Sequence, residues 1–365
     1  MSYSFIKNID SAECLFNTRL NINANYTSLY EGCKVVDTSL TNTEYMSKSV
    51  IDSALSTVKF MNALMSAKVH DIKMSLSETN KDSNVNIISD TIYIHPFIGD
   101  GISLYSYKYS SWLKRVVGPK ALPFKLVDSN NKPLLANTNY DIFLSYNDVM
   151  SSFNLTFVKW KDNTSNTTYS QGVCVLSDTN SLDKRYLGCL RTTQAGTTEL
   201  SFGGVANHGA HPKLFLWNFK NRTPKIISSI TTAEYDSTQL DTWTRTSAIN
   251  ETIDTFNDNR VDLITGDIMY LDFRYQNYFE CTEETTVHSG LAVNSVNSVA
   301  KLYNTICTTN TITAQGWGST ISSLQGTVPR GVHFIQTFDK TNKYVRFNTV
   351  HNDIFKTGFT GTILI

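Results

Sequence analysis

The stretch Arg185–Thr193 reads RYLGCLRTT, and KLFLWNFKNRTPK follows it at Lys213–Lys225. If the first stretch is a β-strand, its side chains point alternately to two faces. One face then carries Arg185, Leu187, Cys189 and Arg191, and the other carries Tyr186, Gly188 and Leu190. We expect Tyr186, Leu187 and Leu190 to pack, and Gly188 to allow close approach of another backbone. The two arginines would then pair with carboxylates or with the WNFKNR stretch.

Short runs rich in β-branched and aromatic residues surround these stretches from Ile87 to the C-terminus, with Gly, Pro, Asn and Asp between them. In NYDIFLSY, alternation places Tyr140, Ile142, Leu144 and Tyr146 on one face. Many short strands with turn residues between them are typical of an antiparallel β-sandwich. We therefore predict a mainly β fold, one jelly-roll-like sandwich or two in tandem. Residues 85–230 form the first sandwich, and residues 231–365 continue it or pack on it.

The N-terminal part has a different residue composition and spacing. Residues 1–42 are mixed and are assigned to an attachment segment, and residues 43–80 contain neither Pro nor Gly. Apolar residues recur there in steps of four and three, which predicts a long helix with a coiled-coil seam between copies, or an amphipathic helix packed on its own domain. The seam consists of Ile51, Leu55, Val58, Asn62, Met65, Val69, Ile72 and Leu76.

Composition excludes several classes of protein. The 365 residues carry 32 Lys and Arg against 32 Asp and Glu, so no basic excess indicates nucleic acid. The N-terminus does not read as a signal peptide, and no apolar run is long enough to span a membrane. The six cysteines are scattered and are expected to be free thiols rather than disulfides.

No catalytic motif stands out. Cys189 lies between two arginines, but no histidine in the motif could act as its base. His208 and His211 have a spacing that suits a metal, yet their glycine-rich flanks read more simply as an exposed loop. Glu283 and Glu284 are adjacent, so on a strand they would point to opposite faces. We therefore expect no catalytic residues, no metal and no cofactor.

The ordered runs resemble a β-sandwich family of tailed-bacteriophage virion proteins, found in head fibres, tail fibres and related appendages. The resemblance covers roughly residues 90–365 and rests on an RYLGxxRTT run followed by a WN[FY]xNR segment. Cys189 stands where the family usually has a small residue or threonine. The resemblance does not decide whether the chain comes from a bacteriophage, such as a crAss-like phage, or from a large algal virus. The motif residues are Arg185, Tyr186, Leu187, Gly188, Arg191, Thr192, Thr193, Trp217, Asn218, Asn221 and Arg222.

The resemblance implies a non-catalytic structural role, as a head-fibre or decoration/tail-appendage subunit assembled in the host cytoplasm and located in the virion. The expected partners are further copies of the chain, as a homotrimer, and capsid or tail proteins that bind the N-terminal segment. A host-surface glycan is a further expected partner, and nucleic acid is not. Two alternatives stay open, a carbohydrate-binding adhesin that uses exposed aromatic residues and a polysaccharide depolymerase with a carboxylate pair.

Overall fold

The computed structural model describes residues 69–162, 165–170, 172–178, 182–203, 211–230, 235–237, 240–245, 260–294, 305–306, 308–347 and 357–365. The chain divides into two units, Met1–Met65 and Ser66–Ile365. All described residues belong to the second unit, and they form strands, bridges and turns without a helix. Among these residues, no helix is long and apolar enough to cross a membrane. The prediction of a mainly β fold is confirmed.

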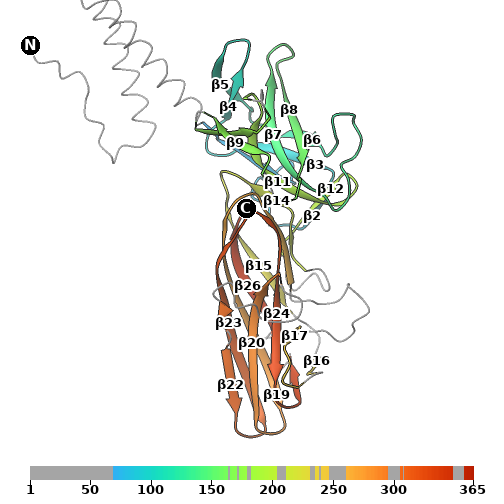
Figure 1. Ribbon diagram of the computed structural model, residues 1–365, viewed down its shortest axis with the longest axis vertical. Coiled ribbons are helices and arrows are strands. Elements are labelled where there is room, and N and C mark those ends of the chain that lie inside the picture. The colour runs from blue at the N-terminus through green and yellow to red at the C-terminus, as the bar shows by residue number, and fades with distance from the viewer. Residues whose placement is uncertain are drawn as a thin grey trace, which may run out of the picture. The chain divides into compact units, whose positions relative to one another are not determined.

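The described residues of the first part of this unit form fourteen strands, and Figure 1 shows how they are arranged. They are β1 (Ile72–Ser75), β2 (Ile87–Ser89), β3 (Thr91–Pro96), β4 (Gly101–Ser106), β5 (Ser111–Val116), β6 (Leu122–Lys125), β7 (Asn139–Asn147), β8 (Ser152–Lys159), β9 (Thr167–Ser170), β10 (Val173–Leu176), β11 (Arg185–Gln194), β12 (Thr197–Ser201), β13 (Lys213–Leu214) and β14 (Leu216–Asn218).

The remaining strands make up the second part. They are β15 (Pro224–Ile230), β16 (Tyr235–Asp236), β17 (Thr244–Arg245), β18 (Arg260–Thr265), β19 (Met269–Cys281), β20 (Thr285–Val293), β21 (Thr305–Ile306), β22 (Thr308–Ile312), β23 (Gly316–Val328), β24 (Gly331–Thr341), β25 (Val345–Phe347) and β26 (Gly358–Leu364).

One large sheet connects the two parts. It runs in the order β22-β20-β24-β18-β13-β12-β11-β10-β9, and its strands β13 and β18 pair in parallel. A second sheet, β15-β26-β19-β23-β21, belongs to the second part, and the small sheet β1-β3-β6 belongs to the first. Neighbouring strands in these two smaller sheets are antiparallel. The jelly-roll arrangement stays a prediction.

The two largest groups of buried side chains among the described residues stabilise these layers. The first core includes Ile72, Ile92, Ile142, Leu144, Leu187 and Leu190. The junction core joins residues of both parts and includes Phe143, Tyr186, Cys189, Trp217, Phe273 and Phe359. In β7 the predicted alternation is confirmed, because Tyr140, Ile142, Leu144 and Tyr146 pack in the first core. Phe143, on the opposite face, packs in the junction core.

Strand pairing moves the predicted boundary between the two β parts. Residues 224–230 were assigned to the first sandwich, but β15 pairs with β26 along its whole length, from Pro224↔Leu364 to Ile230↔Gly358. The first part also starts before residue 85, because β1 pairs with β3. The boundary therefore lies between Asn218 and Pro224, where β14 ends and β15 begins.

The predicted helix over residues 43–80 is wrong at its C-terminal end. Ile72 lies in β1 and is buried, and Leu76 follows in a bend. Positions 72, 74 and 76 also fit a period of two, and pairing with β3 decides between the two readings because it buries Ile72 and Met74 in the first core. The seam positions Ile51, Leu55, Val58, Asn62 and Met65 lie outside the described residues, and Val69 precedes β1.

Candidate functional site

The strand β11, which carries RYLGCLRTT, contains a β-bulge. Tyr186 pairs with Phe143 and Gly188 pairs with Ile142, so Leu187 is an extra residue without a partner on β7. The extra residue reverses the alternation from this point on. Tyr186 and Cys189 pack in the junction core, whereas Leu187 and Leu190 pack in the first core. The prediction that Leu187 and Cys189 share a face is therefore wrong.

Gly188 lies where β11 meets β14, and it pairs with Asn218. Its φ of 155° lies in a region that residues with a side chain rarely adopt. A Cβ atom here would overlap the carbonyl oxygen of Trp217 and would also touch Met74. The predicted close approach of another backbone at Gly188 is confirmed, and that backbone belongs to the second motif.

The two arginines of β11 lie on opposite faces of the sheet. Arg185 pairs with Leu144, which faces the first core, and Arg191 pairs with Asn139, whose side chain points to the opposite face. The prediction of same-face arginines is therefore wrong, because the bulge between them reverses the alternation. The Arg191 guanidinium donates to the Asn139 side-chain oxygen at 2.9 Å and lies 5.9 Å from the Phe215 ring.

Arg185 is buried and holds the chain that leads into β1. Its Nη1 donates to the carbonyl oxygens of Val69, at 2.8 Å, and of Ser103, at 2.7 Å. Burial lowers its pKa to about 10. The two carbonyl groups stabilise this buried charge. Arg185 thereby links β11 to Ser103 in β4 and to Val69, which precedes β1.

Two asparagines of WNFKNR hold β1 along one edge. The Met74 N–H donates to Asn218 Oδ1 at 2.8 Å, and Asn218 Nδ2 donates to the Met74 carbonyl oxygen at 3.1 Å. Asn221 Nδ2 donates to the carbonyl oxygens of His70, at 2.6 Å, and Ile72, at 2.8 Å. The amides thereby act as a neighbouring strand would, on the edge of β1 opposite β3.

The remaining motif residues complete the packing. Trp217 is fully buried in the junction core, and the Arg222 guanidinium lies 5.2 Å from its ring. The Thr192 hydroxyl donates to the carbonyl oxygens of Leu135 and Thr138, and the Thr193 hydroxyl lies 3.5 Å from that of Thr197. The double motif is thus a packing and hydrogen-bonding unit, and sequence alone did not indicate that β1 is what it holds.

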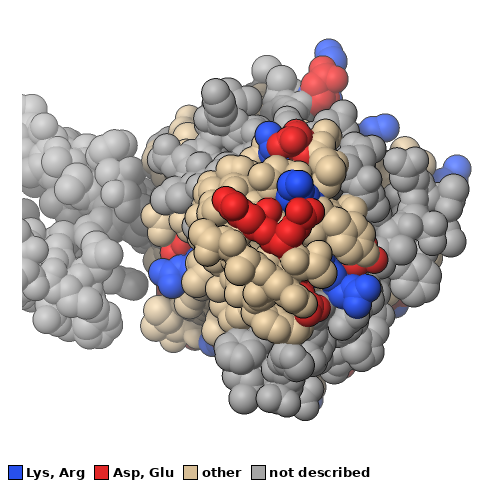
Figure 2. Space-filling view, turned by 90° about the horizontal axis from the view of Figure 1, so that it is seen from below, with Lys and Arg blue, Asp and Glu red and all other residues tan. Residues whose placement is uncertain are grey.

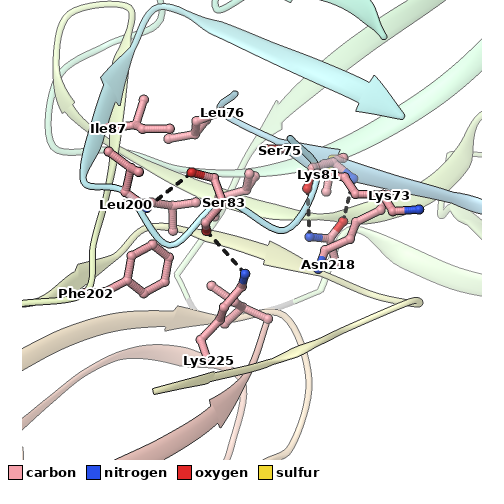
Figure 3. Close-up of a pocket in the computed structure, with 14 residues that line it drawn as sticks. Lys73, Ser75, Leu76, Lys81, Ser83, Ile87, Leu200, Phe202, Asn218 and Lys225 are labelled. Atoms are coloured by element: carbon pink, nitrogen blue, oxygen red, sulfur yellow. Dashed lines mark hydrogen bonds between the residues drawn. The ribbon is translucent and has the colours of Figure 1, made fainter. Parts of the chain in front are cut away.

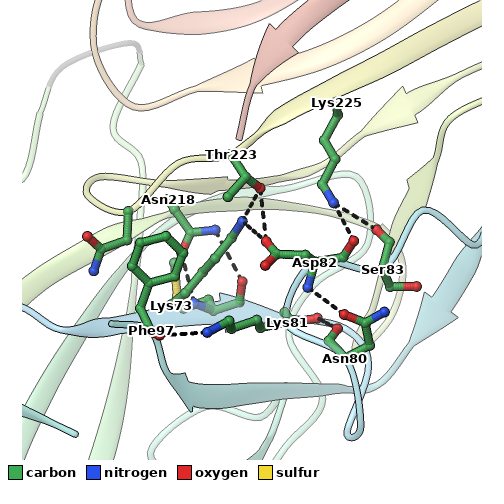
Figure 4. A network of polar contacts seen from close by, with 12 residues as sticks. Lys73, Asn80, Lys81, Asp82, Ser83, Phe97, Asn218, Thr223 and Lys225 are labelled. Atoms are coloured by element: carbon green, nitrogen blue, oxygen red, sulfur yellow. Dashed lines mark hydrogen bonds and ion pairs between the residues drawn. The ribbon is translucent and has the colours of Figure 1, made fainter. Parts of the chain in front are cut away.

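A polar network extends from β1 to the start of β15 (Figure 4). Lys73 Nζ lies 2.9 Å from Asp82 Oδ1 and 2.5 Å from Thr223 Oγ1, and the Thr223 hydroxyl donates to the same carboxylate oxygen at 3.0 Å. Lys225 Nζ donates to the Asp82 and Ser83 carbonyl oxygens and to Asn84 Oδ1, at 2.6, 3.2 and 3.0 Å. These bonds fix the loop between β1 and β2 against the second part.

Burial and charge act together in this network. Burial lowers the pKa of the Lys73 ammonium, and the nearby Asp82 partly opposes that shift. Burial alone would raise the pKa of Asp82, but the bonds from Lys73 and Thr223 outweigh it and lower the pKa. Lys73 is only 3% exposed and Asp82 binds it directly, so the amine is held as a charged partner and is poorly placed to act as a nucleophile.

Beside this network lies a small pocket between β1, β2, β12 and β15 (Figure 3). Its wall combines apolar side chains such as Ile87, Leu200 and Phe202 with the polar groups of Ser83 and Lys225. Its volume of about 20 Å³ is room for about one water molecule. Substrates of the size of a sugar do not fit, and the lysine amines at its edge already bind oxygen atoms.

The thiols of the described residues are unsuited to nucleophilic catalysis. Cys174, Cys189 and Cys281 are free and buried, as the sequence predicted for its cysteines. Burial raises the pKa of Cys174 to about 11 and that of Cys189 well above the ordinary value for a thiol. A reactive cysteine needs an accessible thiolate at neutral pH, and neither residue provides one.

The other candidate residues are also separated. His211 Nε2 lies 2.7 Å from Asp262 Oδ2, while His208 lies outside the described residues. The described residues contain no group of three or more potential metal-ligating side chains. Glu283 and Glu284 lie in the turn between β19 and β20. Figure 2 shows that acidic side chains gather, with basic ones beside them, on the face that it presents. Glu283 pairs with Lys343 at 3.4 Å.

Comparison with known proteins adds little. No family model and no curated protein matches the chain. Among solved structures, a chain of the infectious bursal disease virus Gx strain is 13% identical, with a TM-score of 0.21, over 80% of this chain and 75% of that one. The mosquito-larvicidal Cry4Aa toxin from Bacillus thuringiensis is 8% identical, with a TM-score of 0.20, over 81% of this chain and 52% of that one. Similarities this low carry no argument about fold or function.

Proposed function

We propose that the chain is a structural subunit of a virus particle, a head-fibre or decoration/tail-appendage protein of a tailed bacteriophage, without catalytic activity. The observation that carries the proposal is the use of the double motif. Asn218 and Asn221 bind the backbone of β1, and Arg185 binds the carbonyl group of Val69, just before that strand. Trp217 fills the junction core. A motif whose polar groups are used in this way serves to build a scaffold.

The order of the parts supports a role in an assembly. The motif holds β1, which is the first described strand and comes after residues 1–68, where the attachment segment and most of the helix are predicted. Force transmitted through residues 1–68 would therefore reach the β unit at a strand that is hydrogen-bonded on both edges. We propose that the N-terminal segment binds capsid or tail proteins and that the seam from Ile51 to Met65 joins three copies.

The trimer is tested on the full chain by light scattering. Leu55→Asp places a charge in the proposed seam and should abolish the association of three copies through it, because a buried unpaired charge costs several kcal/mol. Ser53→Asp, off the seam, should leave the trimer intact and is the matched control. A wild-type chain that is monomeric at all concentrations would contradict the trimer. Ile72→Asp would not test the seam, since Ile72 lies in the first core.

The location is tested on particles. Virions purified from infected cells by density gradient and analysed by peptide mass spectrometry should contain the chain in a constant ratio to the major capsid protein. Antibody labelling in electron micrographs would then distinguish the head from the tail. The proposal fails if the chain is abundant in the lysate but absent from purified particles.

One observation favours a second candidate, a host-surface carbohydrate-binding module. Trp112, Trp160 and Trp217 are buried, but Trp317 on β23 is 47% exposed. An exposed indole is the kind of surface on which sugar rings stack. A glycan array should show binding that Trp317→Ala removes and Tyr270→Ala, another exposed aromatic of the same sheet, does not. If both variants bind glycan, or if neither does, the result would argue against a sugar site at Trp317.

A further inference from the structure

The strand β8 is a long open edge of the large sheet. It pairs with β7 over eight consecutive residue pairs, from Asn147↔Ser152 to Tyr140↔Lys159, without a register shift. β7 is its only partner among the strands that the structure describes. Edge strands of this length are templates for pairing with another chain unless they are protected.

The hydrogen-bonding groups that face outward can be assigned. The Trp160 N–H donates to the Asn139 carbonyl oxygen at 2.9 Å, which makes this a hydrogen-bonded pair. In an antiparallel ladder such pairs alternate with pairs that exchange no bond. Phe153, Leu155 and Phe157 therefore direct their N–H and C=O groups away from β7. In the described part of the chain, none of these groups has a backbone partner outside the strand.

The strand lacks the usual protection of an edge. Its sequence, SFNLTFVK, contains no Pro or Gly, and Lys159 at its end is the only charged residue. By contrast, the edge strand β6 has four residues and contains Pro123, and β9 also has four residues. The side chains of Phe153, Leu155 and Phe157 are only partly buried against the first core. An added strand would extend the sheet and cover these side chains.

We propose that β8 of one copy pairs with β8 of a second copy in antiparallel orientation, with Leu155 facing Leu155 on the two-fold axis. Phe153 of each copy then faces Phe157 of the other, and Asn154 faces Thr156. The outward-facing backbone N–H and C=O groups belong to odd-numbered residues, so they meet across the contact only when odd-numbered residues of the two copies face each other. The proposed register meets this condition over residues 152–158. The three hydrogen-bonded pairs exchange about six backbone bonds.

Charge and side-chain type select this register and this partner. In the neighbouring register that also pairs odd-numbered residues, Leu155 of one copy faces Phe157 of the other. The two strands would overlap over the same length there, but Lys159 would lie opposite Phe153. The register centred on Leu155 places aromatic side chains opposite each other and brings no like charges together. An isologous contact needs such a self-complementary strand. The contact is independent of the proposed virion function and of the proposed N-terminal seam, because it uses only residues of the first part.

The first test is cysteine cross-linking of the full chain. In the proposed register the two Leu155 Cα atoms lie about 5.5 Å apart, within disulfide range. Leu155→Cys should therefore give a covalent dimer at twice 41.0 kDa on a non-reducing gel after mild oxidation. Thr156→Cys is the matched control, since its Cα atoms would be about 8 Å apart across a diagonal, beyond reach. The wild type reports the background of the six native cysteines.

The second test does not depend on replacing a packed leucine. Asn154 is exposed and Thr156 half-buried, and the double variant Asn154→Lys with Thr156→Lys would place like charges opposite each other. It should weaken association at least tenfold in sedimentation equilibrium. Asn154→Lys with Thr156→Glu places opposite charges there and should restore it. The proposal is overturned if Leu155→Cys folds but does not cross-link above Thr156→Cys, or if the two charge variants associate equally well. A dimer that persists in the Asn154→Lys, Thr156→Lys variant and is not cross-linked through Leu155→Cys would form through another surface.

Discussion

The side-chain amide of Asn218 forms two hydrogen bonds with the backbone of Met74, one to its N–H at 2.8 Å and one to its C=O at 3.1 Å. The two residues are 144 positions apart in the chain. This pairing explains why an asparagine follows Trp217 in the second motif, because the amide can both donate and accept where a strand edge presents both groups. It also ties the first described strand to the end of the first β part.

Asn218→Ala should therefore lower the free energy of unfolding by about 2 to 4 kcal/mol, because it leaves a buried N–H and a buried C=O of Met74 without a partner. Chemical denaturation checks the value. Asn130→Ala, at an exposed position in a turn, is the control and should change it by less than about 0.5 kcal/mol. An equal effect of both would show that the Asn218 amide is not what holds β1.

Gly188→Ala should be among the most damaging small substitutions, since the added methyl group would overlap the Trp217 carbonyl oxygen. We expect a loss of about 3 kcal/mol or more, from steric overlap and from the unfavourable φ. Gly326→Ala on β23 is a matched control, because nothing lies within 4 Å of its Cβ position. It should be neutral or slightly stabilising. Comparable melting temperatures for the two variants would contradict the close approach.

Arg330→Ala should cost about 3 to 5 kcal/mol, because it leaves the Asp141 carboxylate, which is fully buried, without its cation. Both oxygens of Asp141 accept from Arg330 Nη2 at 2.9 Å, and the guanidinium lies 3.8 Å from the Trp160 ring. A double-mutant cycle with Asp141→Asn should recover part of the loss. Lys125→Ala removes an exposed ion pair with Asp90 and should cost less than about 1 kcal/mol. Additive effects of Arg330→Ala and Asp141→Asn would argue against the pair.

Stability should fall between about pH 9 and 11 in a manner that depends on Cys174. Its pKa rises from the ordinary value of 9.0 to about 11 in the folded chain. Below pH 9 the thiol is protonated in both states, and its contribution is fully present. As the pH rises toward 11, the unfolded chain loses this proton first, so unfolding becomes more favourable, by up to about 2.7 kcal/mol.

The comparison with Cys174→Ala tests this effect, because most lysines and tyrosines that titrate in the same range contribute equally to both proteins. Tyr169 and Arg185, whose pKa values the Cys174 thiolate also raises, are the exceptions. The difference in unfolding free energy between them should shrink as the pH rises from 9 to 11. A difference that stays constant would mean that the thiol is not shielded from water. In the native protein at pH 8, Cys174 and Cys189 should also resist alkylation until denaturant is added.

Local patterns predicted some elements well and others poorly. The alternation in NYDIFLSY predicted the two faces of β7, because each face packs against a different apolar layer. The same argument failed in RYLGCLRTT, because a single extra residue, Leu187, reverses the alternation and leaves no trace in composition. In the predicted seam, Ile72 fitted two periods at once, and only pairing with β3 selected the strand.

Residue types and their spacing were enough to predict that this protein is mainly β, where most strands lie, and that Gly188 permits a close backbone approach. These properties follow from residue type and spacing over a few positions. Tertiary structure alone decided that Asn218 and Asn221 hold β1, that Asp141 pairs with Arg330, and that β15 belongs to the second part. Such contacts join residues far apart in the chain, and their partners depend on strand register and on which groups burial leaves without water.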